Sequence, residues 1–221
     1  MALITSAARS ELIALYVAMF KAAPGAANLT DMVTAYEAGG TTATIAKTLA
    51  AKADFATVYP GFSTGAEFSA SLVANLLGAD VTPAITTWAE GYVLGLLNAG
   101  KSRADAIVTA VVALRATTNT EFTVAQAHFA NDVDVASYYS VTKGQGTATS
   151  TLATLQGVIA GVTSVAASAT TAKATIDTAI TTVATAATAA TTAAAALANT
   201  LTTSVQTLTG TAGDDTFTAP A

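Results

Sequence analysis

Residues 147–207 restrict the fold more than any other segment, because they contain little besides small apolar and hydroxyl side chains. The segment has no proline and no glycine after Gly161, and no charged residue lies between Asp177 and Asp214. Its apolar residues recur at intervals of three and four, which is the spacing of a heptad seam on a helix. Lys173 is the one interruption of that seam. The pattern predicts a long helix whose opposite face is mostly threonine.

Three arrangements of this segment remain open. A single continuous helix requires support from tertiary packing, because threonine is a poor helix former. A helical hairpin bent near Ser164–Ala169 is the second arrangement, and a low-complexity linker is the third. The small residues of the seam favour a helix that approaches a neighbouring helix closely.

Residues 1–146 contain short helical segments separated by proline and glycine. Pro24-Gly25 ends the first segment, and the third extends from about Thr41 to Tyr59. Apolar residues are spaced by three to four rather than by two, so helices are predicted throughout. Further helix starts are marked by capping residues or a first-turn proline, at Thr30-Asp31, Thr64 with Glu67, Thr82-Pro83, Ser102 with Asp105, and Thr123 with Gln126.

The predicted fold class is therefore all-α, with a compact bundle of short helices followed by a long Ala/Thr-rich helix or helical hairpin. The bundle also contains two related helical repeats at an offset of 56 residues, which is the step from Val17 to Val73. At the same offset Met32 corresponds to Trp88, and Tyr36 to Tyr92. We interpret this self-similarity as an internal duplication.

The N-terminal stretch LIALYVAMFKAAPGA admits two interpretations. An apolar run followed by small residues is typical of a secretory signal peptide. Glu11 at the start of the run, and Arg9 as the only preceding basic residue, argue against that interpretation. The apolar residues recur at helical spacing, so we expect an amphipathic core helix. The Ala-rich region contains too much threonine for a stable membrane span.

The composition argues against several classes of protein. Of the 221 residues, 52% are hydrophobic and 10% are charged, which is unlike a charge-rich disordered chain. The net charge is −5 and the lysines and arginines are scattered singly. We therefore expect neither nucleic-acid binding nor attraction to an anionic membrane surface. The absence of cysteine removes disulfides, thiolate metal sites and cysteine nucleophiles.

No group of residues in the sequence has the pattern of a catalytic site, so we expect no enzymatic activity. His128 is the only histidine and lies beside Phe129 on a predicted helix, where a structural role is expected. Asp132 and Asp134 diverge on a helix because they are two residues apart, and both are expected to be solvated. The GQG sequence at 144–146 lacks the preceding strand of a phosphate loop and is interpreted as a turn.

Four large amphipathic side chains are the candidates for polysaccharide binding, namely Tyr36, Trp88, Tyr92 and Tyr139. Aromatic rings bind sugars by stacking on their apolar faces. Rings at helical spacing more often belong to the core, and this is the simpler expectation for Trp88. Tyr36 and Tyr139 are the better candidates for partial exposure.

The terminal stretch GTAGDDTF fits the calcium-binding nonapeptide G-G-x-G-x-D-x-U-x, with Gly210, Gly213, Asp215 and Phe217 in register. Thr211 replaces the second glycine of the pattern. In such repeats aspartate and turn carbonyls ligate calcium, and each site is shared between successive turns. Asp215 is therefore at most half of a calcium site, which we expect to be empty in this chain.

Three stretches resemble parts of bacterial RTX and surface-layer proteins. VANLLGADVTPAITTWAEGYVLG is similar to a helical repeat with the core Y-x-x-x-L-G-R-x-P-D-x-x-G-L-x-Y-W, in which Leu76-Leu77-Gly78 and Trp88 agree but the Arg and Pro-Asp positions do not. FANDVDVASYYSVTKG resembles a segment that follows this domain. The closing LTGTAGDDTF is similar to the first RTX repeat.

The resemblance implies the N-terminal region of a calcium-dependent, type-I-secreted surface-layer (S-layer) protein of a Gram-negative bacterium. The implied regions are an anchoring domain at 1–146, an Ala/Thr-rich helical segment at 147–207, and the truncated start of an RTX-like calcium region at 208–221. Such N-terminal domains attach non-covalently to the O-polysaccharide of lipopolysaccharide.

The implied location is extracellular, on the cell surface, with calcium as the cofactor of the full-length protein. The implied partners are lipopolysaccharide and other copies of the chain in a two-dimensional lattice, without insertion into the membrane. Two alternatives stay open. One is the N-terminal domain of a secreted RTX adhesin or enzyme whose activity lies downstream, and the other is a purely lattice-forming self-association module.

Overall fold

The computed structural model describes residues 4–197, which form an all-α structure with no strand in that range. The predicted fold class is confirmed at this level. The calcium half-site predicted at Asp215 lies outside the described residues. The elements are α1 (Ser6–Phe20), α2 (Gly25–Glu37), α3 (Thr42–Ala50), α4 (Ala53–Val58), α5 (Gly65–Leu77), α6 (Pro83–Asn98), α7 (Arg103–Ala116), the 3-10 turn η1 (Thr120–Phe122), α8 (Thr123–Ser137), the π-helical turn η2 (Tyr138–Thr142), α9 (Leu152–Gly157) and α10 (Ala166–Leu197).

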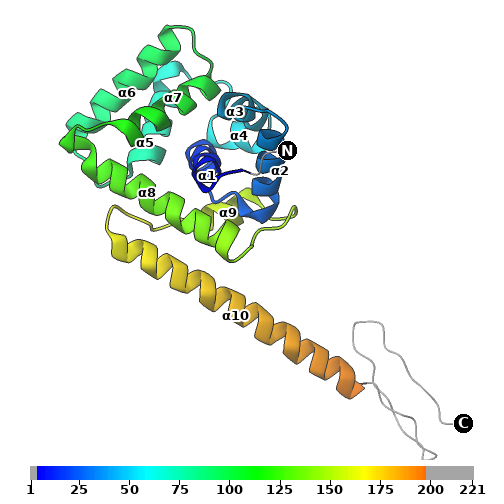
Figure 1. The fold of residues 1–221 in the computed structure, drawn as a ribbon. Coiled ribbons are helices and arrows are strands. Elements are labelled where there is room, and N and C mark those ends of the chain that lie inside the picture. Colours follow the sequence, from blue (N-terminus) through cyan, green and yellow to red (C-terminus); the bar gives the residue numbers. More distant parts are fainter. Residues whose placement is uncertain (1–3, 198–221) are drawn as a thin grey trace, which may run out of the picture. The chain divides into compact units, whose positions relative to one another are not determined.

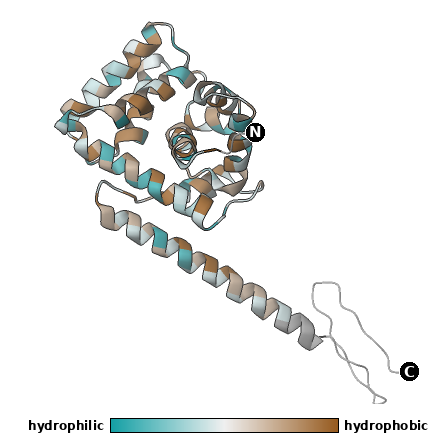
Figure 2. Cartoon of the chain, viewed as in Figure 1, coloured by the Kyte–Doolittle hydropathy of each residue, from teal (hydrophilic) through white to brown (hydrophobic). Residues whose placement is uncertain are grey.

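Helix α1 lies in the middle of the first compact unit, and the other helices of that unit surround it (Figure 1). Every residue from Leu12 to Phe20 is buried. Figure 2 shows the hydrophobic colouring of this helix and of the inward sides of its neighbours. The predicted core helix is present, but it is not amphipathic, because a helix that is covered on all sides needs no polar face.

The connection after α1 is shorter than predicted, because α2 begins earlier in the sequence. Lys21 has a left-handed backbone with φ 48°, and α2 then begins at Gly25 rather than near Thr30. The backbone at Gly146 passes directly beside the backbone at Gly25. Next to this contact, Ala26 N donates a hydrogen bond of 2.6 Å to the carbonyl of Gln145. The GQG sequence lies in an irregular loop after η2 rather than in a turn, and its last glycine allows two backbones to touch.

Capping residues account for several helix starts. Thr64 and Glu67 form the predicted capping box, with Thr64 N donating to Glu67 Oε2 at 2.7 Å and Glu67 N donating to Thr64 Oγ1 at 3.2 Å. Thr123 does not cap α8, which is preceded directly by η1. Gln126 instead donates from its side-chain amide to the carbonyls at the end of α7. The predicted helix at 41–59 is divided into α3 and α4.

The segment that follows residue 146 does not form one continuous helix. Residues 158–165 separate α9 from α10 and include Gly161, whose φ is 77°. Leu155, Ile159 and Val162 are buried in the first unit, and this unit extends through Ala174. The boundary predicted at 146 therefore lies inside it. This break ends at residue 165, within the range Ser164–Ala169 in which the hairpin alternative placed a bend. The apolar residues nevertheless keep helical spacing across the break.

The second unit begins at Thr175, within α10. Residues 181–191 are all exposed, so the predicted packing along one face is absent from this part of the helix. Threonine hydroxyls here donate to the carbonyl four residues earlier, for example from Thr185 to Thr181 at 2.9 Å. These bonds satisfy the hydroxyl groups without a partner helix.

The two proposed repeats correspond to α1–α2 and α5–α6, but their environments differ. Met32 is buried with 3% of its surface exposed, whereas Trp88, at the equivalent position, is 59% exposed. The duplication remains a prediction from the sequence.

We predict that Gly146→Ala destabilises the protein more than Gly144→Ala does. Both glycines have positive φ, at 88° and 59°, so each alanine incurs a left-handed backbone cost of about 1–2 kcal/mol. Only at Gly146 would the new Cβ lie 2.5 Å from the Cα of Gly25, which adds about 1–3 kcal/mol of overpacking. Urea unfolding followed by circular dichroism measures the difference, and equal costs would contradict the close approach.

Candidate functional site: an aromatic cavity

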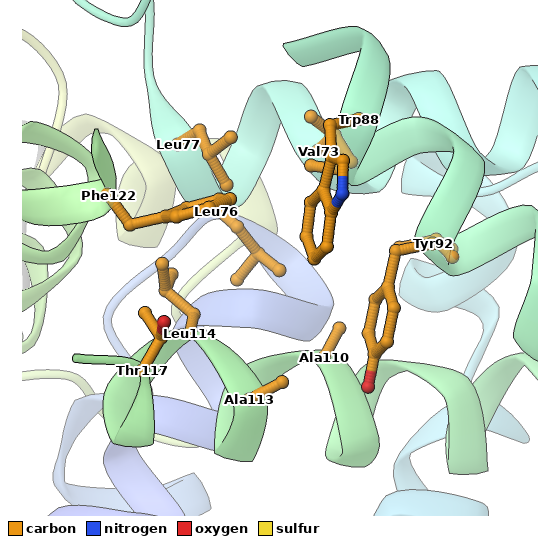
Figure 3. A pocket seen from close by; sticks show the side chains of 12 residues that line it. Val73, Leu76, Leu77, Trp88, Tyr92, Ala110, Ala113, Leu114, Thr117 and Phe122 are labelled. Atoms are coloured by element: carbon orange, nitrogen blue, oxygen red, sulfur yellow. The ribbon is translucent and has the colours of Figure 1, made fainter. Parts of the chain in front are cut away.

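A cavity of about 180 Å³ opens between α5, α6, α7 and η1 (Figure 3). Its wall is almost entirely apolar and includes three aromatic rings. The lining residues are Val73, Leu76, Leu77, Trp88, Ala89, Tyr92, Val93, Ala110, Ala113, Leu114, Thr117 and Phe122.

Helical spacing explains why these residues share one space. On α5, Val73, Leu76 and Leu77 lie on one face because they are separated by three and four positions. On α6, Trp88 and Tyr92 are separated by four positions and project to the same side. The facing part of α7 presents alanine side chains, which are too small to fill the gap. The cavity is therefore the result of large rings standing opposite small residues.

The three rings form a fixed cluster at the cavity. The rings of Trp88 and Tyr92 are stacked, with centroids 5.6 Å apart and an interplanar angle of 5°. Phe122 meets Trp88 edge-on, with centroids 5.3 Å apart and an angle of 68°. Figure 3 shows Trp88 between the other two rings. Both geometries are favourable for aromatic pairs, so Trp88 is held in place although more than half of its surface is exposed.

The chemistry of the cavity is that of a binding site for an uncharged ligand. No charged residue lines it. The polar side-chain groups carried by its lining residues are the indole N–H of Trp88, the hydroxyl of Tyr92 and the hydroxyl of Thr117 (Figure 3). Thr117 Oγ1 accepts a hydrogen bond from Asn119 N at 3.2 Å. The arrangement combines a stacking surface with a few polar groups, which is typical of small-molecule and sugar sites.

The structure brings together two of the four residues predicted to bind polysaccharide. Trp88 and Tyr92 both line the cavity, and Trp88 is exposed rather than part of the core, so the simpler expectation for it was wrong. Tyr36 lies on α2 and Tyr139 on η2. Both are half-buried and neither lines the cavity. Burial raises the pKa of the Tyr139 hydroxyl.

Phe122 is the aromatic lining residue that sequence reasoning missed. It lies in η1, a three-residue turn, and is 7% exposed. Its neighbours in the sequence are polar, so no helical or strand periodicity marks it. The only signal is a lone aromatic residue directly before the start of a helix.

A second notable cluster is an ion pair between the end of α1 and α8, in which the aspartate is buried and the lysine is partly exposed. The ammonium of Lys21 donates to Asp132 Oδ2, and Asp132 has no exposed surface. The predicted solvation of Asp132 was therefore wrong, because that side of α8 faces the end of α1. Asp134 is exposed as predicted, and its Oδ2 accepts from Lys173 Nζ at 2.6 Å.

His128 completes this cluster. Its Nε2 lies 3.2 Å from Lys21 Nζ and 3.5 Å from Asp132 Oδ2. A lysine ammonium can only donate, so Nε2 is the acceptor and the ring is neutral. Burial lowers the pKa of His128 and raises the pKa of Asp132, while the charge of Lys21 opposes the rise at Asp132. The ring also fills the space beside Gly78, where a Cβ would lie 2.7 Å from it.

No protein-family model, curated protein or solved structure matches this chain. Among the helices of residues 4–197, none is by itself long and apolar enough to cross a membrane, and only the bent pair α1 and α2, at 120°, meets the criterion together. Across the same described residues, no group of three or more histidine and acidic side chains is placed to hold a metal ion.

We predict that Asp132→Asn lowers the free energy of unfolding by about 1–3 kcal/mol, because the Lys21 ammonium, 29% of whose side chain is exposed, loses a charged hydrogen-bond acceptor. The matched control is Asp134→Asn two residues later, where the carboxylate is exposed and a change within about 0.5 kcal/mol is expected. Urea denaturation of both variants makes the comparison. Similar losses in the two would show that the Lys21–Asp132 pair is not a stabilising contact.

We predict that the contribution of His128 to stability falls as the pH is lowered from 7 towards 5. Burial depresses the pKa of His128 in the folded state, so below about pH 6.5 the unfolded chain binds a proton more readily than the folded one. The raised pKa of Asp132 has the opposite effect on stability. At pH values just above the unfolded pKa of this carboxyl, the folded chain binds the proton more readily than the unfolded one. His128 is the only histidine, so unfolding curves of wild type and His128→Gln isolate its part. An unchanged slope in the variant would refute the assignment.

Proposed function

We propose that this chain is a non-catalytic, extracellular module of a Gram-negative surface layer that attaches to the O-polysaccharide of lipopolysaccharide. The observation that carries the proposal is the exposure of Trp88, 59% of whose surface is accessible while Tyr92 and Phe122 hold its ring. A large aromatic side chain displayed at the mouth of a cavity is a feature of binding surfaces.

The aromatic cluster supports a sugar as the ligand. Sugar rings have apolar C–H faces that stack on an indole, while their hydroxyl groups need hydrogen-bonding partners at the edge. Trp88 and Tyr92, whose side chains carry an N–H and a hydroxyl, are both among the residues that line the cavity. Because the rings are held before the ligand arrives, little conformational freedom is lost on binding.

The charge pattern supports an uncharged part of the polysaccharide. No acidic or basic side chain lines the cavity, so neither attraction nor repulsion of a charged sugar is built into it. Binding that depends on stacking is only weakly screened by salt. In this proposal calcium belongs to the region around Asp215, outside the described residues, and secretion is of type I.

We predict that Trp88→Ala weakens binding to smooth lipopolysaccharide by roughly tenfold, equivalent to about 1.4 kcal/mol, because the stacking surface is removed. Co-sedimentation with smooth lipopolysaccharide, and with lipopolysaccharide that lacks O-polysaccharide, measures the effect. Raising the salt concentration is expected to change wild-type binding by less than about twofold.

The matched control is Phe62→Ser, which removes an aromatic ring that is 92% exposed and does not line the cavity. It is expected to bind smooth lipopolysaccharide like the wild type. The proposal would be contradicted if the wild type bound both forms of lipopolysaccharide equally well, or if it bound neither form. Equal losses in the two variants would show that the cavity is not the binding site.

A further inference from the structure

Phe62 has the most exposed large hydrophobic side chain in the described part of the chain, at 92% of its surface. It lies in the loop between α4 and α5. Exposure of a phenylalanine to water is unfavourable by an amount that increases with its apolar area. Within residues 4–197 the ring has little packing that would offset this exposure.

The loop that carries Phe62 is held from both sides by Arg103. The guanidinium donates from Nη1 to the carbonyl of Pro60 at 2.8 Å and from Nη2 to the carbonyl of Ser63 at 2.5 Å. The same guanidinium lies over the ring of Phe68, 5.1 Å from its centroid. The backbone on either side of Phe62 is thereby anchored to α5 and α7, and the ring is presented at a defined position.

Phe62 and the aromatic cavity lie at opposite ends of the α5–α6 pair. Gly65, at the start of α5, packs beside Leu94 and Leu97 near the end of α6. The cavity is lined instead by residues from the end of α5, such as Leu76, and by Trp88 near the start of α6. Thirteen helical residues span roughly 20 Å, so Phe62 is far from the cavity of its own chain.

We propose that Phe62 of one copy inserts into the aromatic cavity of a second copy. The size of the cavity supports this occupant, because apolar cavities of about 150 Å³ bind benzene and this one measures about 180 Å³. Trp88, Tyr92 and Phe122 offer both faces and edges to an entering ring. With no charged side chain in the lining, insertion of the ring requires no charge of the cavity wall to be desolvated.

The contact joins two different surfaces, so its repetition gives open rows or closed rings, and a pair closes only where each copy inserts its Phe62 into the other. One aromatic side chain buries about 150–250 Å², whereas a stable interface buries about 800 Å² on each partner. The contact is therefore weak between two isolated copies and becomes effective where many copies are held together. This goes beyond the proposed function, because it assigns the contact between neighbouring modules of an array.

The absence of cysteine from the chain allows a direct test by disulfide cross-linking. Gly61→Cys places a thiol beside Phe62, and Thr117→Cys places one in the cavity wall. Under mild oxidation the double variant is expected to give a ladder of covalent dimers, trimers and larger oligomers. Adding Phe62→Ser to the double variant is expected to abolish the ladder.

Gly91→Cys in place of Thr117→Cys is the control for random collision. Gly91 is exposed on α6, has open space around it and does not line the cavity. The proposal is overturned if the Gly91 pair cross-links as well as the Thr117 pair, or if Phe62→Ser leaves the yield unchanged. Phe62→Ser still binds smooth lipopolysaccharide if the proposed function holds, so failure of one proposal is distinguishable from failure of the other.

Discussion

The burial of α1 on every side is the constraint on which the rest of the first unit depends. A helix with nine consecutive buried residues, from Leu12 to Phe20, cannot lie on a surface and has to be enclosed by other helices. The chain must then leave the core at the end of this helix, and it changes direction at Lys21, which has a left-handed backbone conformation. The ammonium of that residue lies beside the buried carboxylate of Asp132, which ties the end of α1 to α8. The enclosure and the ion pair are thus two consequences of one hydrophobic helix.

The aromatic cavity is a local departure from this close packing. Protein interiors are normally filled to the density of organic crystals, and a void of this size lowers stability. Ala110 and Ala113 on α7 leave the space open, while Trp88 stands at its mouth with most of its surface in solvent. Folding alone favours neither feature. Their occurrence together at one place is the physical reason for regarding the cavity as a site rather than as a packing defect.

Local signals in the sequence predicted what depends on neighbouring residues. The capping box of Thr64 and Glu67 needs only a separation of three positions, and helical periodicity needs only the next turn. The environment of Asp132 could not be predicted in this way, because its partner Lys21 is 111 positions away. The break before α10 was also obscured, since buried residues on both sides of Gly161 keep helical spacing. Phe122 had no periodic pattern to mark it. The exposure of Trp88 depends on which helices cover α6, and the sequence of α6 contains no information on that.

The two proposals place two ligands at one cavity, and this has a physical consequence for an assembled surface. A sugar and the Phe62 ring of a neighbour exclude each other, so the occupant is decided by the product of affinity and effective concentration. Under the two proposals a module therefore holds either a sugar or the Phe62 of a neighbour, and the share of each state follows the ratio of these two products. Under both proposals, one uncharged cavity serves attachment in some modules and lateral contact in others, without any change in the fold of the module.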